Sequence, residues 1–144
     1  MTKVIFKRIK KITPRVEQQL MNLQRACLPH DAPVRPAAAY YWWIGYATKM
    51  PVAFCLLKPS VQWVDAAYLA RSGVLYLWRG RGLQKRMIQI RERAAKKLGY
   101  VWLLSDTTEN PPSANSLARR GYQMYDPRRP WGAETTLYWR KRLK

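Results

Sequence analysis

The sequence predicts a mixed α/β fold in a single domain spanning residues 1–144. The first observation is the order of its periodicities: strand, helix, three strands, helix, strand, helix and two strands. The second is size, since 144 residues with 48% hydrophobic content can bury a sizeable core. The third is a glycine-containing turn, Arg79–Gln84, between an apolar strand and an amphipathic helix. The sequence contains no repeat and no interdomain linker.

The chain begins with a strand and a helix. Val4 to Ile9 alternates apolar and basic residues, as a half-buried strand does. Thr13 and Pro14 are typical of a helix start, with the hydroxyl as N-cap and proline at the first helical position. A loop from Pro29 to Pro36 ends this helix. Its apolar stripe consists of Val16, Leu20, Leu23 and Cys27.

Three strands come next. An antiparallel hairpin is predicted where two apolar runs flank a short turn that contains proline. The runs are Tyr40 to Tyr46 and Val52 to Leu57. Tyr68 to Leu75 predicts the strand that leads into the glycine turn.

The second helix is amphipathic, begins at Leu83 and is ended by Gly99. We expect its buried face to consist of Leu83, Met87, Ile90, Ala94 and Leu98. We expect its water-facing side to consist of Lys85, Arg86, Gln89, Glu92, Arg93, Lys96 and Lys97.

The rest of the chain predicts a strand, a short helix and two strands. Tyr100 to Leu104 is almost continuously apolar, which is typical of a strand covered on both faces. Asn110 and two prolines open the short helix, and Gly121 ends it. Tyr122 to Tyr125 and Thr135 to Leu143 predict the final strands.

Charge and composition narrow the function classes. With 27 Lys and Arg against 8 Asp and Glu, the net charge is +19. Such an excess favours a polyanionic partner, although a solvated surface is the alternative. No apolar run approaches the roughly 20 residues of a membrane span, so no membrane association is expected. No signal core follows the basic N-terminus, and Cys27 and Cys55 read as buried free thiols rather than a disulfide, so we expect a cytoplasmic protein.

The turn Arg79–Gln84 has the features of a phosphate-binding device. Glycines let the backbone approach an anion closely, and the free amides at the start of the following helix point toward it. Arginines within the turn add charge-assisted hydrogen bonds. A tight strand-to-helix turn with surface arginines is the alternative interpretation.

Almost the whole chain resembles the GNAT superfamily of acyl-CoA-dependent N-acetyltransferases. Three segments carry the resemblance. Val74–Gly82 is similar to the strand end and pyrophosphate loop of the family, and Asn110 with Gly121-Tyr122 is similar to its Asn-to-Gly-Phe segment. Thr136–Arg140 is similar to its aromatic last strand. The run from Asn110 to Leu117 is also similar to small members encoded by bacteriophages, for which the host cytoplasm would be the location.

The resemblance implies a splayed, mostly antiparallel sheet of six to seven strands with helices on both faces. Acetyl-CoA would lie between the fourth and fifth strands, with its pantetheine on the backbone near Gly73–Leu75 and its pyrophosphate on the amides from Arg81 to Lys85. No metal is expected. The cofactor-binding residues would be Gly73, Val74, Leu75, Arg79, Gly80, Arg81, Gly82, Leu83, Gln84, Lys85, Asn110 and Asn115.

Three positions depart from the family pattern. Gln84 stands where the loop usually ends in Gly or Ala, so its side chain must point away from the pyrophosphate or bond to it. Leu117 stands where many members carry the tyrosine that acts as general acid, and the adjacent Ser116 is a poor acid. Tyr68 stands where several members place a glutamate. A thiolate nevertheless leaves without much help, since a thiol has a pKa near 8.5.

An alkylamine must lose a proton before it attacks, so a base is needed. The catalytic candidates are Asp65, Tyr68 and Ser116. Other candidates for the base are Asp31, Asp106, Asp126, Glu134 and His30, and a water chain is a further alternative.

The resemblance implies that the acceptor lies between two loops, which are Pro29–Pro36 and Asp126–Gly132 and which contain several arginines. The acceptor-binding candidates are Arg35, Arg128, Arg129 and Trp131. Such a mouth repels free polyamines and favours an amine attached to something anionic: aminoacyl-tRNA, a modified DNA or other nucleic-acid base, or an acidic protein. Trp131 and Tyr125 could stack on a base or belong to the core.

The function predicted is transfer of an acetyl group from acetyl-CoA to such a primary amine, by a monomer or homodimer. The alternative is a catalytically inactive module of the same fold that binds nucleic acid or a host protein through its basic surface. A helix-turn-helix protein is excluded by the strand content.

Overall fold

The computed structural model describes residues 2–144 and contains a seven-stranded sheet in the order β1-β2-β3-β4-β5-β7-β6. The pairing of β4 with β5 is parallel, whereas β1–β2, β2–β3, β5–β7 and β6–β7 are antiparallel. The strands are β1 (Val4–Arg8), β2 (Tyr41–Ala47), β3 (Met50–Pro59), β4 (Ala66–Val74), β5 (Trp102–Thr108), β6 (Gln123–Met124) and β7 (Thr136–Arg142). The helices are α1 (Pro14–Cys27), α2 (Leu83–Lys97), α3 (Pro111–Arg119) and the short 3₁₀ helix η1 (Tyr76–Trp78). The predicted fold class and element order are confirmed, and η1 is the one addition.

The chain forms two compact units. The first unit contains the residues up to Lys58 and Ala70–Ile90, and the second contains Pro59–Leu69 and Arg91–Lys144. Strand β4 and helix α2 therefore each contribute to both units. Within residues 2–144, no helix has the length and apolar character needed to cross a membrane.

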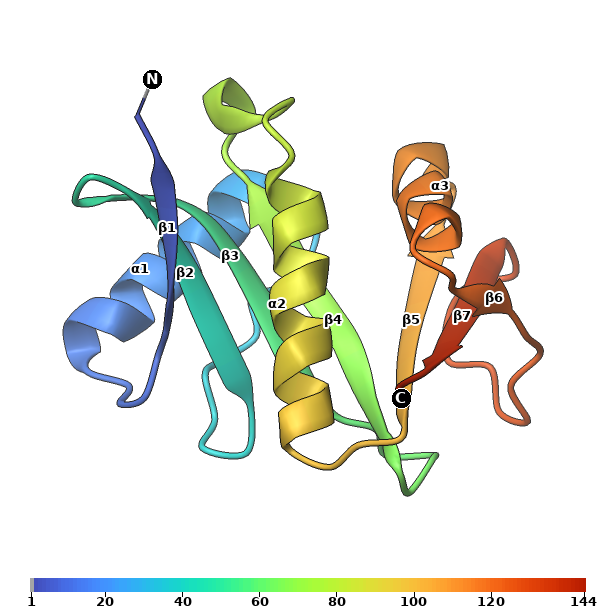
Figure 1. Ribbon diagram of the computed structural model, residues 1–144. Helices are drawn as coiled ribbons and strands as arrows, with labels where there is room; N and C mark the ends of the chain where they lie inside the picture. Colours follow the sequence, from blue (N-terminus) through green and yellow to red (C-terminus); the bar gives the residue numbers. More distant parts are fainter. Residues whose placement is uncertain (1) are drawn as a thin grey trace. The chain divides into compact units, whose positions relative to one another are not determined.

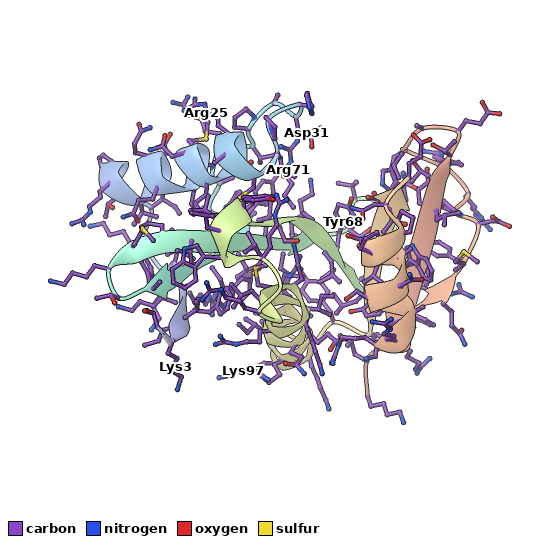
Figure 2. All side chains as sticks on the ribbon, turned by 90° about the horizontal axis from the view of Figure 1, so that it is seen from above. Lys3, Arg25, Asp31, Tyr68, Arg71 and Lys97 are labelled. Atoms are coloured by element: carbon purple, nitrogen blue, oxygen red, sulfur yellow. The ribbon has the colours of Figure 1, made fainter. Side chains whose placement is uncertain are left out.

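In the first unit, α1 and the start of α2 cover opposite faces of β1–β3 (Figures 1 and 2). Helix α1 begins where Thr13 Oγ1 accepts a hydrogen bond from Val16 N at 3.2 Å, as the Thr-Pro pair predicted. Its stripe packs into a buried cluster with β2 and β3. The fully or nearly fully buried members of that cluster are Leu20, Leu23, Trp42, Ile44, Phe54 and Leu56.

The loop after α1 is fixed by a buried glutamine. Gln24 is 1% exposed, and its amide donates to Val34 O at 2.9 Å and accepts from Val34 N at 2.8 Å. This reciprocal pair resembles one rung of a β-ladder. Arg71 Nη1 donates to Ala32 O at 2.6 Å, and Figure 2 shows Arg71 beside the loop that carries Asp31. The loop predicted over residues 29–36 is therefore an ordered structure.

Gly73 on β4 is required by close packing. A Cβ there would lie 2.5 Å from Cys27 Cβ and 2.8 Å from Phe54 Cε1, distances that no side chain accommodates without displacement.

Burial raises the pKa of the Cys27 thiol, although Arg79 acts in the opposite direction, so the thiol stays protonated at neutral pH. Cys55 is buried as predicted and Cys27 is half-buried, and within residues 2–144 neither cysteine forms a disulfide.

In the second unit, β5 lies between the start of β4 and β7. Ala66 pairs with Trp102, and the antiparallel register places Trp102 opposite Arg142 and Asp106 opposite Tyr138. Helix α3 starts as predicted, because Asn110 Oδ1 accepts a hydrogen bond from Ser113 N at 3.2 Å.

Part of the predicted orientation of α2 is wrong. Glu92, expected to face water, is 9% exposed, whereas Leu98, expected to be buried, is 42% exposed. Glu92 accepts hydrogen bonds from Arg120 Nη2 at 2.6 Å, Tyr122 OH at 2.9 Å and Lys141 Nζ at 3.0 Å. The helix turns this carboxylate inward because the segment after α3 and strand β7 supply cationic and hydroxyl donors for it.

The Glu92 network predicts acid sensitivity. Burial raises the pKa of Glu92, but the hydrogen bonds from Arg120, Lys141 and Tyr122 outweigh burial and hold it below its ordinary value of 4.5. The network therefore stabilises the fold above pH 4.5, and this stabilisation is lost as pH falls through the lower pKa of the folded state. Burial and the same carboxylate raise the pKa of Tyr122, which stays a neutral donor.

Glu92→Gln should lower the free energy of unfolding at pH 7 by about 2 kcal/mol, because it leaves two cations without their carboxylate in a partly buried site. Urea titrations at pH 7 and pH 4 should show a smaller pH dependence for this variant than for the wild type. Glu17→Gln is the control, since Glu17 pairs at 3.1 Å with a largely exposed Arg35, and its cost should stay below about 1 kcal/mol. Equal losses for the two variants would contradict the assignment.

Candidate active site

The turn after β4 takes a conformation that only glycine adopts easily. Gly80 has φ = 76° and Gly82 has φ = 74°, both in the left-handed region. No atom lies within 4 Å of the position where a Cβ would stand at either residue. The glycines therefore serve backbone geometry and leave open space beside the turn.

Helix α2 starts in that open space with free amide groups. The bond from Arg86 N to Gly82 O, at 3.2 Å, closes the first turn of the helix, so the amides of Leu83, Gln84 and Lys85 have no acceptor within it. No acidic residue lies in this first turn. Free amides and the positive end of the helix dipole together suit a phosphate group.

The arginines of the turn are held by local contacts. Arg79 Nε donates to Val74 O at 3.2 Å, and the Arg81 guanidinium lies 4.3 Å from the centre of the Trp78 ring. Arg79 and Arg81 are exposed, so both stay accessible to an anion. Arg86, by contrast, lies 4.9 Å from the Phe6 ring centre and packs on β1.

Gln84, which departs from the family pattern, points at β4. Its Oε1 accepts a hydrogen bond from Ser72 Oγ at 3.0 Å. Its side chain therefore braces the turn against the strand and leaves its own backbone amide uncovered. On the strand, Leu75 N donates to Val52 O at 2.9 Å and Val74 O accepts from Arg79, so the predicted pantetheine segment Gly73–Leu75 has some of its backbone groups already engaged.

The second unit places an acidic side chain among aromatic ones. Asp106 Oδ2 accepts hydrogen bonds from Tyr68 OH and from Trp131 Nε1, both at 2.5 Å. The Trp131 ring lies 4.7 Å from the Tyr138 ring and 6.0 Å from the Tyr68 ring, edge to face in both cases. Tyr68, Asp106 and Trp131, predicted separately as catalytic, basic and acceptor-binding candidates, are thus brought together. No sequence pattern indicated the hydrogen bond between Trp131 and Asp106.

The loop between β6 and β7 is anchored through several backbone groups. Gly132 N donates to Tyr138 OH at 2.8 Å, and Arg129 O accepts from Gln62 Nε2 at 3.0 Å. The side chains of Arg128 and Arg129 are exposed. The loop therefore presents cations to solvent while its backbone is fixed.

Other candidate residues lie away from this cluster. Asp65 precedes β4, and its carbonyl accepts a hydrogen bond from Val101 N at 2.8 Å, while its side chain is exposed. Since Ala66 pairs with Trp102, Asp65 is level with Val101 and lies five residues, or roughly 16 Å, along the strands from Asp106. On α3, Ser116 is half-buried and Asn115 exposed.

The remaining predicted positions have structural partners or face solvent. Asn110 caps α3, and Leu117, at the position of the family's tyrosine, is 5% exposed and belongs to the core. In the first unit, Arg35 pairs with Glu17, and His30 and Asp31 are exposed. Within residues 2–144, no three His, Cys, Asp or Glu side chains cluster as metal ligands.

A strand, a left-handed glycine turn and a helix with no acidic residue in its first turn are typical of α/β proteins that bind a phosphate group at a helix N-terminus. The family model described as the acetyltransferase (GNAT) family matches residues 14–122. The chain belongs to this acetyltransferase family. A search of curated proteins gave no match.

Solved structures share the fold at low sequence identity. A GNAT-family protein from Desulfovibrio desulfuricans superposes with a TM-score of 0.81 at 12% identity, covering 99% of this chain and 100% of that one. The ribosomal-protein-S18-alanine N-acetyltransferase of Escherichia coli gives 0.75 at 12% identity, covering 96% and 94%. A Bacillus subtilis acetyltransferase, solved in complex with CoA, gives 0.76 at 13% identity, covering 99% and 100%.

Proposed function

We propose that this protein transfers an acetyl group from acetyl-CoA to a primary amine on an acidic or nucleic-acid-associated acceptor. The observation that carries the proposal is the turn Gly80–Gly82, with its open space and the free amides of α2, in a chain of the acetyltransferase family. The Bacillus subtilis relative of the same fold was solved with CoA.

The residues of the turn fit the cofactor. Its pyrophosphate would accept hydrogen bonds from the amides of Leu83, Gln84 and Lys85, with Arg79 and Arg81 supplying positive charge. Gly73–Leu75 would bind the pantetheine through the backbone groups that Val52 and Arg79 leave free. Asn110 caps α3 through its side chain, so its part in cofactor binding, like that of Asn115, would be indirect.

Bound acetyl-CoA supplies a thioester carbonyl and a thiolate leaving group. The chain's own contribution would be to position the amine and receive its proton. We assign the role of general base to the Asp106 carboxylate. Tyr68 and Trp131 donate hydrogen bonds to its Oδ2, and its Oδ1 would keep its lone pairs for the N–H of the incoming amine. The N–C bond would form, the C–S bond would break and the amine proton would pass to Asp106. The thiolate would leave without a protein acid, because Leu117 stands where many family members have the tyrosine that protonates it.

Exposed arginines near the cluster favour an anionic acceptor. Arg128 and Arg129 lie in the loop that Trp131 anchors, and they would repel a free polyamine. Aminoacyl-tRNA, a modified DNA base and an acidic protein all satisfy this requirement. A cytoplasmic location, kinship with bacteriophage-encoded members and a monomeric or homodimeric state stay predictions.

The test is release of CoA by the purified protein with amine acceptors of opposite charge, followed by mass spectrometry of the products. We expect acetylation of amines on anionic carriers and little or none of spermidine. A protein that binds acetyl-CoA yet acetylates nothing in an extract of expressing cells would favour the inactive module.

A further inference from the structure

In the second unit, one face of the sheet carries aromatic and arginine side chains. Side chains alternate along β7, and Lys141 points to Glu92 on α2, at 3.0 Å. Its neighbours Arg140 and Arg142 therefore lie on the opposite face. The register places Arg142 opposite Trp102, so this ring shares the face with them.

Aromatic rings surround Arg140 on this face. Its guanidinium lies 5.3 Å from the ring centre of Tyr125, 5.4 Å from that of Trp102 and 5.8 Å from that of Trp63. Arg142 lies 5.8 Å from the Trp102 ring. We call Trp63, Trp102, Tyr125, Arg140 and Arg142 the aromatic–arginine surface. The three rings and Arg140 are half-buried and Arg142 is exposed, so all five remain partly accessible to solvent.

The guanidinium groups of this surface have no carboxylate partner within residues 2–144. On the same face, Asp106 uses Oδ2 for Tyr68 and Trp131. Asp65 and Asp126 follow Trp63 and Tyr125 closely in sequence, but neither forms an ion pair with a residue that the structure describes. A guanidinium has five N–H donors, so Arg140 and Arg142 retain donors for an external anion.

We propose that the aromatic–arginine surface binds single-stranded nucleic acid. Arg140 and Arg142 would bind phosphates, and bases would stack on the accessible faces of the rings. A duplex hides its base faces and an acidic peptide has none, so rings interleaved with unpaired arginines favour a single strand over both. The net charge of +19 adds long-range attraction for a polyanion. This binding does not depend on acetyl transfer and is measured without acetyl-CoA.

The test is fluorescence anisotropy of the full chain with labelled 12-mers of dT and dA, and with a duplex of the same length. We expect single strands to bind more tightly than the duplex, and the affinity to fall steeply between about 50 and 200 mM salt. Trp63→Ala should weaken binding about 10-fold or more through lost stacking. Because Trp63 also packs on Trp102, its thermal unfolding is measured alongside.

Arg142→Gln provides a variant that leaves the packing of the rings in place. Its matched control is Arg93→Gln, an exposed arginine on α2 in the same unit. We expect Arg142→Gln to weaken single-strand binding several-fold more than Arg93→Gln. Equal effects of the two variants, equal affinity for duplex and single strand, equal competition by polyglutamate, or no binding at 50 mM salt would each overturn the proposal.

Discussion

Replacing Gly82 by Asp should lower the affinity for acetyl-CoA by about 100-fold or more while the protein stays folded. The new carboxylate would stand beside the free amides of α2, where the pyrophosphate is proposed to bind, and like charges brought together cost several kcal/mol. About 2.8 kcal/mol corresponds to a 100-fold change in affinity. Isothermal titration calorimetry with acetyl-CoA measures the loss, and circular dichroism checks the fold.

Two further variants separate charge from backbone strain. Gly82→Asn introduces a neutral side chain of almost the same shape, and Asn tolerates the left-handed region about as well as Asp. Gly99→Asp introduces the same carboxylate at another open glycine, with φ = 91°, at the end of α2. We expect Gly82→Asn to lose much less affinity than Gly82→Asp, and Gly99→Asp to bind acetyl-CoA like the wild type.

A result in which all three glycine variants bind acetyl-CoA equally would remove the turn from the cofactor site. A result in which Gly82→Asp and Gly99→Asp both unfold would instead show that positive φ at these residues is needed for stability. Thermal denaturation of each variant distinguishes these two outcomes.

The turn between β4 and α2 could be predicted because its signals are local. Glycine at 80 and 82 reports backbone conformation, and the apolar run before Val74 and the amphipathic pattern after Leu83 fix a strand and a helix. Helix starts at Thr13 and Asn110 were predictable for the same reason, since an N-cap side chain bonds only three residues ahead.

Tertiary polar contacts could not be predicted in this way. Glu92 was predicted to face water because it is charged. It is buried because Arg120, Tyr122 and Lys141, which are distant in the sequence, all donate hydrogen bonds to it. Gln24 is buried because it substitutes for a strand partner of Val34. In each case the hydrophobic periodicity of the helix predicts only which apolar residues are buried. A polar side chain is buried when residues far away in the sequence form hydrogen bonds with it, and the periodicity does not show those partners.

The candidate catalytic residues show the same division. Asp106 was one of several acids of equal standing in the sequence, and its selection comes from two donors that hold one of its oxygens. Tyr68, which departs from the family's glutamate, is one of those donors. Trp131 was expected either to bind the acceptor or to belong to the core. It is 40% exposed, and its indole N–H donates a hydrogen bond to Asp106, so it is neither a fully buried core residue nor a free surface side chain.

Asp106→Asn should lower kcat by about 100- to 10,000-fold, the usual contribution of a positioned general base. The amine would then have to lose its proton to solvent before attack. The rate of the variant should therefore keep rising with pH toward the amine's own pKa, near 10 for an alkylamine. Acetyl-CoA affinity should not change, because the turn that is proposed to bind it lies elsewhere in the chain.

Two controls decide whether Asp106 acts on the proton or only supports the fold. Tyr68→Phe removes one donor to Oδ2 and keeps the carboxylate, so it should cost far less activity than Asp106→Asn. Asp65→Asn changes an exposed acid about 16 Å along the strands from Asp106 and should leave kcat unchanged. Loss of activity at Asp65 with retention at Asp106 would move the base to the start of β4. An Asp106→Asn enzyme with normal kcat and an unchanged pH profile would leave deprotonation to water.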